Sequence, residues 1–237
     1  MSAVGWPVRV IGQVPLGVFK YGKEDDAMFV RGTRTQTPPD QLDEAVENFQ
    51  KHVVPNLRSA PGFFGAVLLA DRKSGSGIGI TYWETAKALS ASEQVGSQAR
   101  TQAAENVAGT QIVNVERYEI VILERAHPPT PGEFARVNTI GGDTEKVDSA
   151  TSFVSNKVLP VLKSLKGYRA IVMGVDRQTG RSTVSTLWDT LADLEASDSK
   201  LAGLRKEAAR AAGADEIQVE IFETRVFDFR AATPSES

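Results

Sequence analysis

The sequence predicts an α+β fold in which two tandem ferredoxin-like units pack sheet to sheet as a pseudo-twofold α+β barrel within one chain. Three observations predict it: the second half of the chain repeats the first, each half reads in the order βαββαβ, and the strands are apolar on both faces. With 237 residues, 41% hydrophobic and 24% charged, the chain has the composition of an ordinary globular protein.

The repeat is the strongest signal in the sequence. A shift of 105 residues places Pro55 on Pro160 and Trp83 on Trp188. Between residues 31–112 and 136–217, 22 of 82 aligned pairs are identical, and the register holds without a gap. This likeness predicts that one supersecondary unit is used twice.

The first unit is predicted over residues 28–125 from its hydrophobic periodicity and its turn residues. A Gly/Ser-rich turn at 73–77 joins two apolar runs as a hairpin. The predicted elements are a strand at 28–35, a helix with an apolar stripe from Leu42 to Leu57, strands at 63–71 and 78–85, a helix at 86–107 and a strand at 113–123.

The second unit is predicted over residues 133–230 with the same elements, its last strand running from Gln218 to Phe229. Three prolines within 126–132 predict an extended linker between the units. The predicted flanking segments are an N-terminal arm at 1–27, in which Val8 to Val14 is a candidate edge strand, and a disordered tail at 231–237.

The first helix of each unit is expected to kink or to end early. Pro55 and Pro160 lie near its end, where proline removes a backbone donor and crowds the preceding turn.

The strands explain why one chain needs two copies of the unit. Strict alternation would place Phe63, Val67 and Leu69 on one face of a strand and Phe64, Ala66 and Leu68 on the other. Helices can cover only one face of such a sheet, so the other must be buried too. The simplest solution packs the two bare faces together, so that the duplication replaces a homodimer.

Composition excludes several classes of function. The net charge is −3 and no basic cluster is present, so nucleic acid is not an expected partner. No apolar run is long enough to span a membrane and no signal peptide is evident, which predicts a cytoplasmic protein without a membrane partner. The chain has no Cys and only two His, His52 and His127, so neither a metal nor a haem site is expected.

Short motifs in both halves resemble the antibiotic biosynthesis monooxygenase (ABM) family of the dimeric α+β barrel superfamily. The similar stretches are residues 54–57, 60–63 and 82–85, with their counterparts 159–162, 166–168 and 187–190. The resemblance covers nearly all of residues 28–229 and implies a barrel of the type that the repeat predicts. It also implies a cofactor-independent oxygenase acting on a small aromatic or polyketide-like metabolite bound between sheet and helices.

The resemblance implies that Trp83 and Trp188 line such pockets, where a polycyclic phenolic substrate stacks. The alternative is that each tryptophan packs in a core and satisfies its indole donor locally. The position of Tyr82 is occupied by Leu187 in the second copy, so Tyr82 is a candidate for making one pocket different from the other.

Arg31 and Arg136 occupy equivalent places on the first strand of each unit. A guanidinium on a buried strand needs a carboxylate or a ligand oxygen. The two arginines are therefore candidates for an anion clamp in a pocket, or for salt bridges to residues such as Glu116 and Glu220 on the last strands.

The chain departs from the ABM pattern at polar positions. Those oxygenases have an asparagine four residues before the tryptophan, a tyrosine six after it and an arginine about twenty after it. The residues found there are Gly79, Leu89 and Ala103 in the first copy and Val184, Leu194 and Ala208 in the second, with Arg100 and Arg205 within one turn of the arginine position.

Three functional hypotheses follow. The first is an ABM-type oxygenase without a cofactor, in which an arginine balances negative charge on the substrate. The second is a non-catalytic ligand-binding or structural barrel, because acid and base residues are scarce. The third uses reduced flavin in the pocket. The expected partner is a small hydrophobic or aromatic molecule, and the intrachain pseudo-dimer leaves room for a further homodimer.

Overall fold

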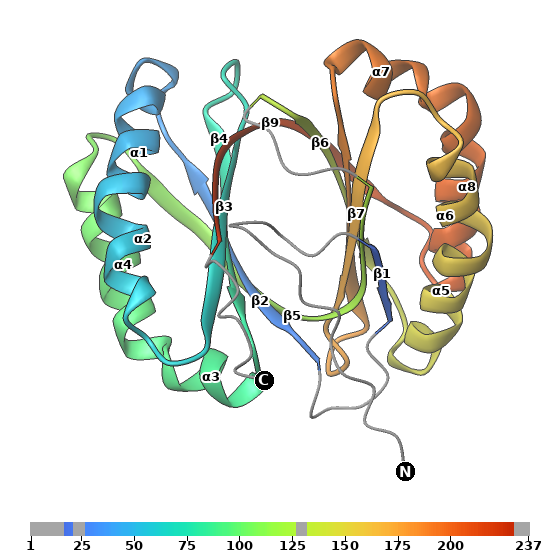
Figure 1. Ribbon diagram of the computed structural model, residues 1–237, viewed down its shortest axis with the longest axis horizontal. Coiled ribbons are helices and arrows are strands. Elements are labelled where there is room, and N and C mark those ends of the chain that lie inside the picture. Colours follow the sequence, from blue (N-terminus) through green and yellow to red (C-terminus); the bar gives the residue numbers. More distant parts are fainter. Residues whose placement is uncertain (1–16, 21–26, 127–131, 230–237) are drawn as a thin grey trace, which may run out of the picture.

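The chain forms a closed antiparallel β-barrel with helices packed on two opposite flanks. The computed structural model describes residues 17–20, 27–126 and 132–229. Figure 1 looks into the barrel, with one group of helices from each half of the chain on either side. This arrangement is the α+β barrel that the repeat predicts.

The first unit contains four barrel strands and two interrupted helices. Its elements are β2 (Phe29–Gln36), a 3₁₀ turn (Pro39–Gln41), α1 (Leu42–Asn48), a π-helical turn (Phe49–Val53), α2 (Val54–Arg58), β3 (Phe63–Ala70), β4 (Ser76–Trp83), α3 (Ala86–Ala91), α4 (Glu93–Asn106) and β5 (Gln111–Arg125). A short strand, β1 (Gly17–Lys20), pairs with the end of β5.

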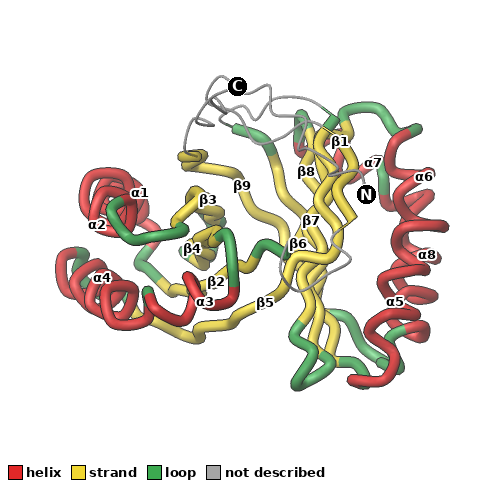
Figure 2. Tube along the Cα trace, turned by 60° about the horizontal axis from the view of Figure 1, so that its bottom comes forward, coloured by secondary structure: helices red, strands yellow, loops and turns green. Residues whose placement is uncertain are grey.

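The second unit repeats this order. Its elements are β6 (Phe134–Gly141), a 3₁₀ turn (Thr144–Lys146), α5 (Val147–Phe153), a π-helical turn (Val154–Val158), α6 (Leu159–Lys163), β7 (Tyr168–Val175), β8 (Arg181–Trp188), α7 (Leu191–Ala196), α8 (Asp198–Ala211) and β9 (Gln218–Phe229). The tube view separates the two groups of helices and the sheet that each covers (Figure 2).

Two long strands close the barrel by belonging to both units. Residues 111–119 of β5 pair with β2, and residues 119–125 pair with β7 of the other unit. In the same way β9 pairs with β6 over 218–223 and with β3 over 223–229. Around the barrel the strands run β5-β2-β4-β3-β9-β6-β8-β7 and return to β5. Closure leaves no free edge in this eight-strand ring.

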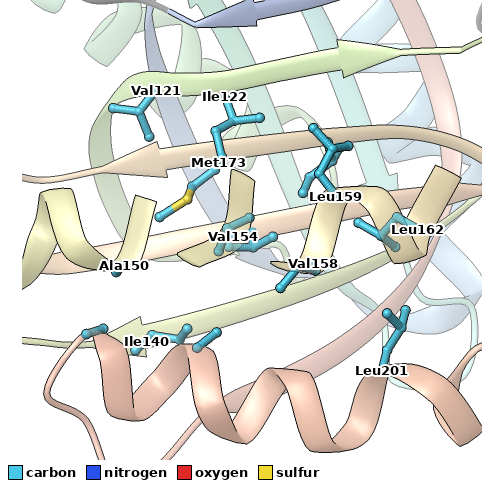
Figure 3. Close-up of a cluster of buried hydrophobic side chains, with 14 of the residues drawn as sticks. Val121, Ile122, Ile140, Ala150, Val154, Val158, Leu159, Leu162, Met173 and Leu201 are labelled. Carbon is cyan, nitrogen blue, oxygen red and sulfur yellow. The ribbon is translucent and has the colours of Figure 1, made fainter. Parts of the chain in front are cut away.

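Alternation along each strand sends side chains either to the helices or into the barrel. Two clusters therefore lie between a sheet and its helices, and a third lies between the two sheets. In the second unit, Val154, Val158 and Leu162 point from the helix toward the sheet, where Met173 lies (Figure 3). Both faces of the strands are buried, as their sequences predict.

One detail of the predicted alternation is wrong. A β-bulge between Phe63 and Gly65 shifts the register of β3 against β4. The bulge places Phe63 with Ala66 and Leu68 in the helix-facing core, while Phe64 packs with Val67 and Leu69 in the barrel. An extra residue in a strand reverses the side of every residue before it, and strict alternation cannot show this.

Both prolines lie just after an irregular turn, and the helix continues past each of them, so the expected early end is not found and the expected kink stays a prediction. Pro55 follows the π-helical turn 49–53, and Pro160 follows the turn 154–158. Proline has no N–H to bond the carbonyl four residues earlier, so the preceding turn widens while the helix continues.

The second helix of each unit differs from the predicted single helix at 86–107. It breaks at Ser92, and its counterpart breaks at Ser197. The strand before it ends at Trp83, and Thr85 caps the helix instead of extending the strand: its hydroxyl accepts from the Ala88 N–H at 3.0 Å. Hydroxyl side chains at this position satisfy a donor that the first turn leaves unpaired.

Some predictions fall outside the described residues. These are the candidate edge strand from Val8 to Val14, His127, most of the linker and the tail 231–237. Among the described residues, no helix is long and apolar enough to cross a membrane.

Leu162 provides a test of the second helix-facing core. Its side chain is fully buried, so Leu162→Ala should lower the free energy of unfolding by about 2–5 kcal/mol through lost contacts and a cavity. Urea denaturation followed by circular dichroism measures this. Leu191→Ala, at an exposed leucine, is the control and should change stability by no more than about 0.5 kcal/mol. Equal losses in both variants would contradict this picture of the core.

Candidate functional site

The first unit contains a cavity between its helices and its sheet. The cavity holds about 850 Å³ of empty space, part of it open to solvent. Apolar side chains such as Phe49, Leu57 and Leu68 form most of its wall, and Arg31 and Arg100 also line it. An apolar hollow with a few polar groups is the usual form of a small-molecule site.

The alternation of β2 and β4 produces this wall. Arg31, Thr33 and Thr35 follow one another on the helix-facing side of β2, and Gly77 and Gly79 lie on the same side of β4. Glycine contributes no side chain, so Phe49 and Thr35 can lie close against β4 at these positions. A Cβ at position 79 would lie 3.1 Å from the ring of Phe49.

Arg31 is tied to the break between α3 and α4. Its guanidinium donates to the Leu89 carbonyl at 2.8 Å, to the Ser92 hydroxyl at 3.1 Å and to Glu93 at 2.9 Å. Burial lowers the pKa of Arg31, and the charge of Glu93 opposes that shift. The Nε atom of Arg31 has no hydrogen-bond partner within the described residues. The buried arginine therefore keeps one donor uncommitted beside the cavity.

Glu93 is shared by three arginines. Arg100 donates to one carboxylate oxygen at 2.7 Å, while Arg31 and Arg117 donate to the other at 2.9 and 2.6 Å. Partial burial would raise the pKa of Glu93, but the hydrogen bonds from Arg117 and Arg100 and the charge of Arg31 outweigh it and lower the pKa to about 2. Three guanidinium groups against one carboxylate leave this end of the cavity positive.

The second unit repeats most contacts of the arginine cluster. Arg136 donates to the Leu194 carbonyl at 3.0 Å and to the Ser197 hydroxyl at 2.9 Å, and it pairs with Asp198 at 3.0 Å. Arg205 also binds Asp198, at 2.7 Å. The third arginine is missing. Arg31 on β2 pairs with Arg117 on β5, whereas the equivalent Arg136 on β6 pairs with Ile221 on β9.

The cavity of the second unit is about half as large, with about 450 Å³ of empty space. Larger side chains fill it at equivalent positions. From the first unit to the second, the equivalent residues change from Thr35 to Ile140, from Gly79 to Val184, from Gly96 to Leu201 and from Ala99 to Leu204. Gly96 matters most, since a Cβ there would lie 2.7 Å from one Arg31 nitrogen and 3.2 Å from one Arg100 nitrogen. The first unit therefore combines its arginines with the larger open space.

The five residues predicted from the sequence do not meet in one pocket. Arg31 lines the cavity of the first unit, Arg136 lines that of the second, and Tyr82 points into the barrel. Trp83 and Trp188 are fully buried and line none of these three cavities.

Each tryptophan is held in the same way. The indole N–H of Trp83 donates to Thr81 at 3.0 Å, and that of Trp188 donates to Thr186 at 3.1 Å. The Arg31 guanidinium lies 5.6 Å from the centre of the Trp83 ring, within the range of a cation–π contact. Contact of either tryptophan with a ligand stays a prediction.

Glu116 and Glu220 are not the partners of Arg31 and Arg136. They bind Arg34 instead, at 3.4 and 2.7 Å. Arg34 and Arg31 lie three residues apart on one strand and therefore project to opposite faces. His52 is exposed, as its match to Lys157 suggests. No cluster of His, Asp or Glu suited to a metal occurs in the described ranges.

Sequence reasoning missed Ser92, Glu93 and Gly96. The repeat carried part of the signal, because Ser92 and Arg100 are identical to Ser197 and Arg205. The decisive difference, Gly96 against Leu201, has meaning only when both arginines are seen to converge on that helix turn.

The family comparison agrees with this geometry. Residues 28–104 match the model of the family described as antibiotic biosynthesis monooxygenase. The chain carries an ABM domain. The match spans β2 to α4, the elements that form most of the cavity of the first unit and hold Arg31, Glu93 and Arg100.

Relatives of similar length share both units. The chain is 29% identical to "Uncharacterized protein Rv2557" of Mycobacterium tuberculosis (strain H37Rv) over 208 residues, covering 88% of this chain and 92% of the relative. It is also 29% identical to "Uncharacterized protein Rv2558" of the same strain over 204 residues, covering 86% of each.

Solved structures show the same fold. An anthrone oxidase-like protein superimposes with a TM-score of 0.66 at 15% identity, covering 93% of this chain and 98% of the other. A candidate monooxygenase of Fusobacterium nucleatum gives a TM-score of 0.63 at 11% identity, with 87% and 96% covered. At these identities the likeness shows the fold alone.

Replacement of Glu93 tests the arginine cluster of the ABM unit. Glu93→Gln should lower stability at pH 6, because three guanidinium groups lose their common carboxylate. The folded pKa of about 2 lies below the ordinary value of 4.5. The stabilisation is therefore complete above that ordinary value and lost as the pH falls toward 2.

Denaturant unfolding of both proteins across this pH range measures the difference. Glu145→Gln, at an exposed carboxyl, is the control. A gap between wild type and Glu93→Gln that stays constant down to pH 2 would refute the ion-pair explanation.

Proposed function

We propose that the protein is an ABM-type oxygenase that binds one small aromatic anion per chain in the cavity of the first unit. The observation that carries the proposal is a largely apolar cavity in which Arg31 and Arg100, the charged lining residues, converge on Gly96. The family match and the monooxygenase-like structural neighbours favour oxygen chemistry over other uses of such a cavity.

The residues suit a flat, largely apolar ligand with one ionisable oxygen. The wall offers aromatic and aliphatic contact from Phe49, Leu57 and Leu68. The guanidinium groups of Arg31 and Arg100 provide fixed positive charge where a phenolate or enolate oxygen would lie. Anthrone, a tricyclic ketone whose enol ionises readily, is a suitable probe of this class.

The reaction needs no bound cofactor when the substrate itself supplies the electrons. Oxidation of the anthrone methylene consumes one O₂ and gives the carbonyl of anthraquinone and one H₂O, so atoms and electrons balance. The arginines would lower the pKa of the enol by favouring its anion, and this anion is the form that donates an electron to O₂. The apolar wall would keep water away from the reactive intermediate.

The cavity offers no general base among its lining residues. Its titratable side chains are Arg31 and Arg100, and neither accepts a proton at neutral pH. The proton of the enol would therefore go to solvent through the open part of the cavity. Activity should rise with pH as the bound ligand ionises.

The lack of a general base among the lining residues of the cavity favours a second candidate function. Without a base, the protein could bind aromatic anions and not turn them over. Binding without oxygen consumption would identify this function. A cytoplasmic location and a homodimer beyond the intrachain pseudo-dimer remain predictions from the sequence.

Replacement of Arg100 tests the oxygenase. Arg100→Gln should lower kcat/KM for anthrone by about 10- to 100-fold at pH 7, the range expected for one lost charge-assisted hydrogen bond. Arg100→Lys should keep part of the activity. If the arginine acts by favouring the anion, raising the pH should restore much of the activity of Arg100→Gln. An oxygen electrode measures the rates.

Arg205→Gln is the matched control, because Arg205 holds the same place in the second unit. Its activity should equal that of the wild type. No oxygen uptake with anthrone by the wild type would contradict the oxygenase proposal, and an equal loss in both arginine variants would contradict the placement of the site in the first unit.

A further inference from the structure

We infer that the barrel interior is a second binding site, separate from the cavity of the ABM unit, and that it takes a neutral apolar molecule. The interior holds about 910 Å³ of empty space between the two sheets, part of it open to solvent. It is lined from both units, and it lies on the opposite face of the strands from Arg31. An eight-stranded barrel can be filled by side chains or can hold one small ligand.

The interior of this barrel is not filled. Apolar residues in the middle of its strands, such as Ile80, Val172 and Phe227, remain partly exposed although they face inward. Residues at such positions in a packed core are inaccessible. Their exposure is to the hollow itself, and it leaves apolar surface for a ligand to cover.

The hollow arises because the second unit carries small side chains where the first carries large ones. Equivalent barrel-facing pairs are Val30 and Ala135, Leu69 and Gly174, Ile78 and Thr183, and Ile80 and Ser185. The exchange runs the other way at Gly32 and Val137. Tyr118 fills the space above Gly174, whereas a Cβ at Gly32 would meet only Ile78, at 3.9 Å. Thr183 and Ser185 also line the hollow.

One end of the hollow is crossed by a charge network. Arg34 binds Glu116 and Glu220 and donates to Thr139 at 3.2 Å, which links strands β2, β5, β9 and β6. Arg181 adds a second bridge to Glu116 at 2.8 Å. Two arginines and two glutamates balance in this network.

The other end is aromatic. Tyr82 lies 5.2 Å from Phe229 between ring centres, and Arg125 stacks on Phe227 at 5.1 Å while it pairs with Glu133 at 3.4 Å. The hydroxyl of Tyr82 forms no hydrogen bond with a described residue. Burial raises the pKa of Tyr82 to about 12, so this hydroxyl stays neutral.

The balance of charge decides the class of ligand. The described charged groups that line the hollow are paired with groups of opposite sign, whereas the first cavity has an excess of guanidinium groups. Moving an unpaired charge into the apolar barrel would be costly. The barrel should therefore prefer an uncharged molecule with aromatic or aliphatic bulk and a single polar group that can reach Tyr82, Thr183 or Ser185.

Two fluorescent probes with one skeleton separate the two sites. N-phenyl-1-naphthylamine is neutral, and 1-anilinonaphthalene-8-sulfonate adds one sulfonate to the same rings. The neutral probe should bind in the barrel with one site per chain, and the sulfonate should bind beside Arg31 and Arg100. Both are titrated into the full chain and followed by emission.

Variants copied from the other unit fill each site in turn. Thr183→Ile with Ser185→Ile gives the barrel the residues found at 78 and 80, and should weaken the neutral probe at least tenfold while leaving the sulfonate unchanged. Gly96→Leu copies position 201 and should do the reverse. Circular dichroism and thermal unfolding verify that the variants fold.

If the double variant does not fold, Ala135→Val, which introduces the residue found at position 30, takes its place in the experiment. It should weaken the neutral probe about threefold. Unchanged affinity for the neutral probe in a folded barrel variant, or its loss in Gly96→Leu, would overturn the inference. Failure of the sulfonate to bind would count against the proposed anion site and would leave the barrel result standing.

Discussion

The fold depends on β5 and β9, which are each shared by both units. Their first halves complete the sheet of their own unit, and their second halves pair with the opposite sheet. Backbone hydrogen bonds therefore close the ring, and neither sheet is left with an open edge. Closure separates three buried spaces: one under each pair of helices and one inside the barrel. Each proposed site lies in one of these spaces.

Duplication freed the two units to differ. Both keep the arginine that binds the helix break, through Ser92 in one and Ser197 in the other. This contact fixes the second helix against the sheet and serves structure. The residues around it have diverged: Gly96 leaves the first cavity open, while Leu201 occupies the second. Inside the barrel the small residues lie mainly on the second unit. The helix-facing cavity is larger in the first unit, and the barrel hollow is lined from both units, so one chain can offer two chemically different cavities.

The fold was largely predictable, and the site only in part. Periodicity located nearly every strand and helix, since burial of one face imposes a regular pattern on local sequence. The bulge at Phe63 and the break at Ser92 were not predictable, because each is set by contacts with distant residues. Arg31 was recognised as a buried charge in need of a partner. That partner is Glu93, and it could not be named because it lies on a helix 62 residues away.

The sequence by itself determined the repeat, the order of elements, the burial of both strand faces and the lack of thiol and imidazole chemistry. The tertiary structure alone decided which side each arginine faces, that the tryptophans lie sealed in the cores, and which cavities stay open. The physical reason is that composition and period report what must be buried, whereas empty space depends on side chains from several elements meeting at one point. Gly96 is an ordinary helix residue in the sequence, and it becomes the floor of a cavity only where Arg31 and Arg100 converge on it.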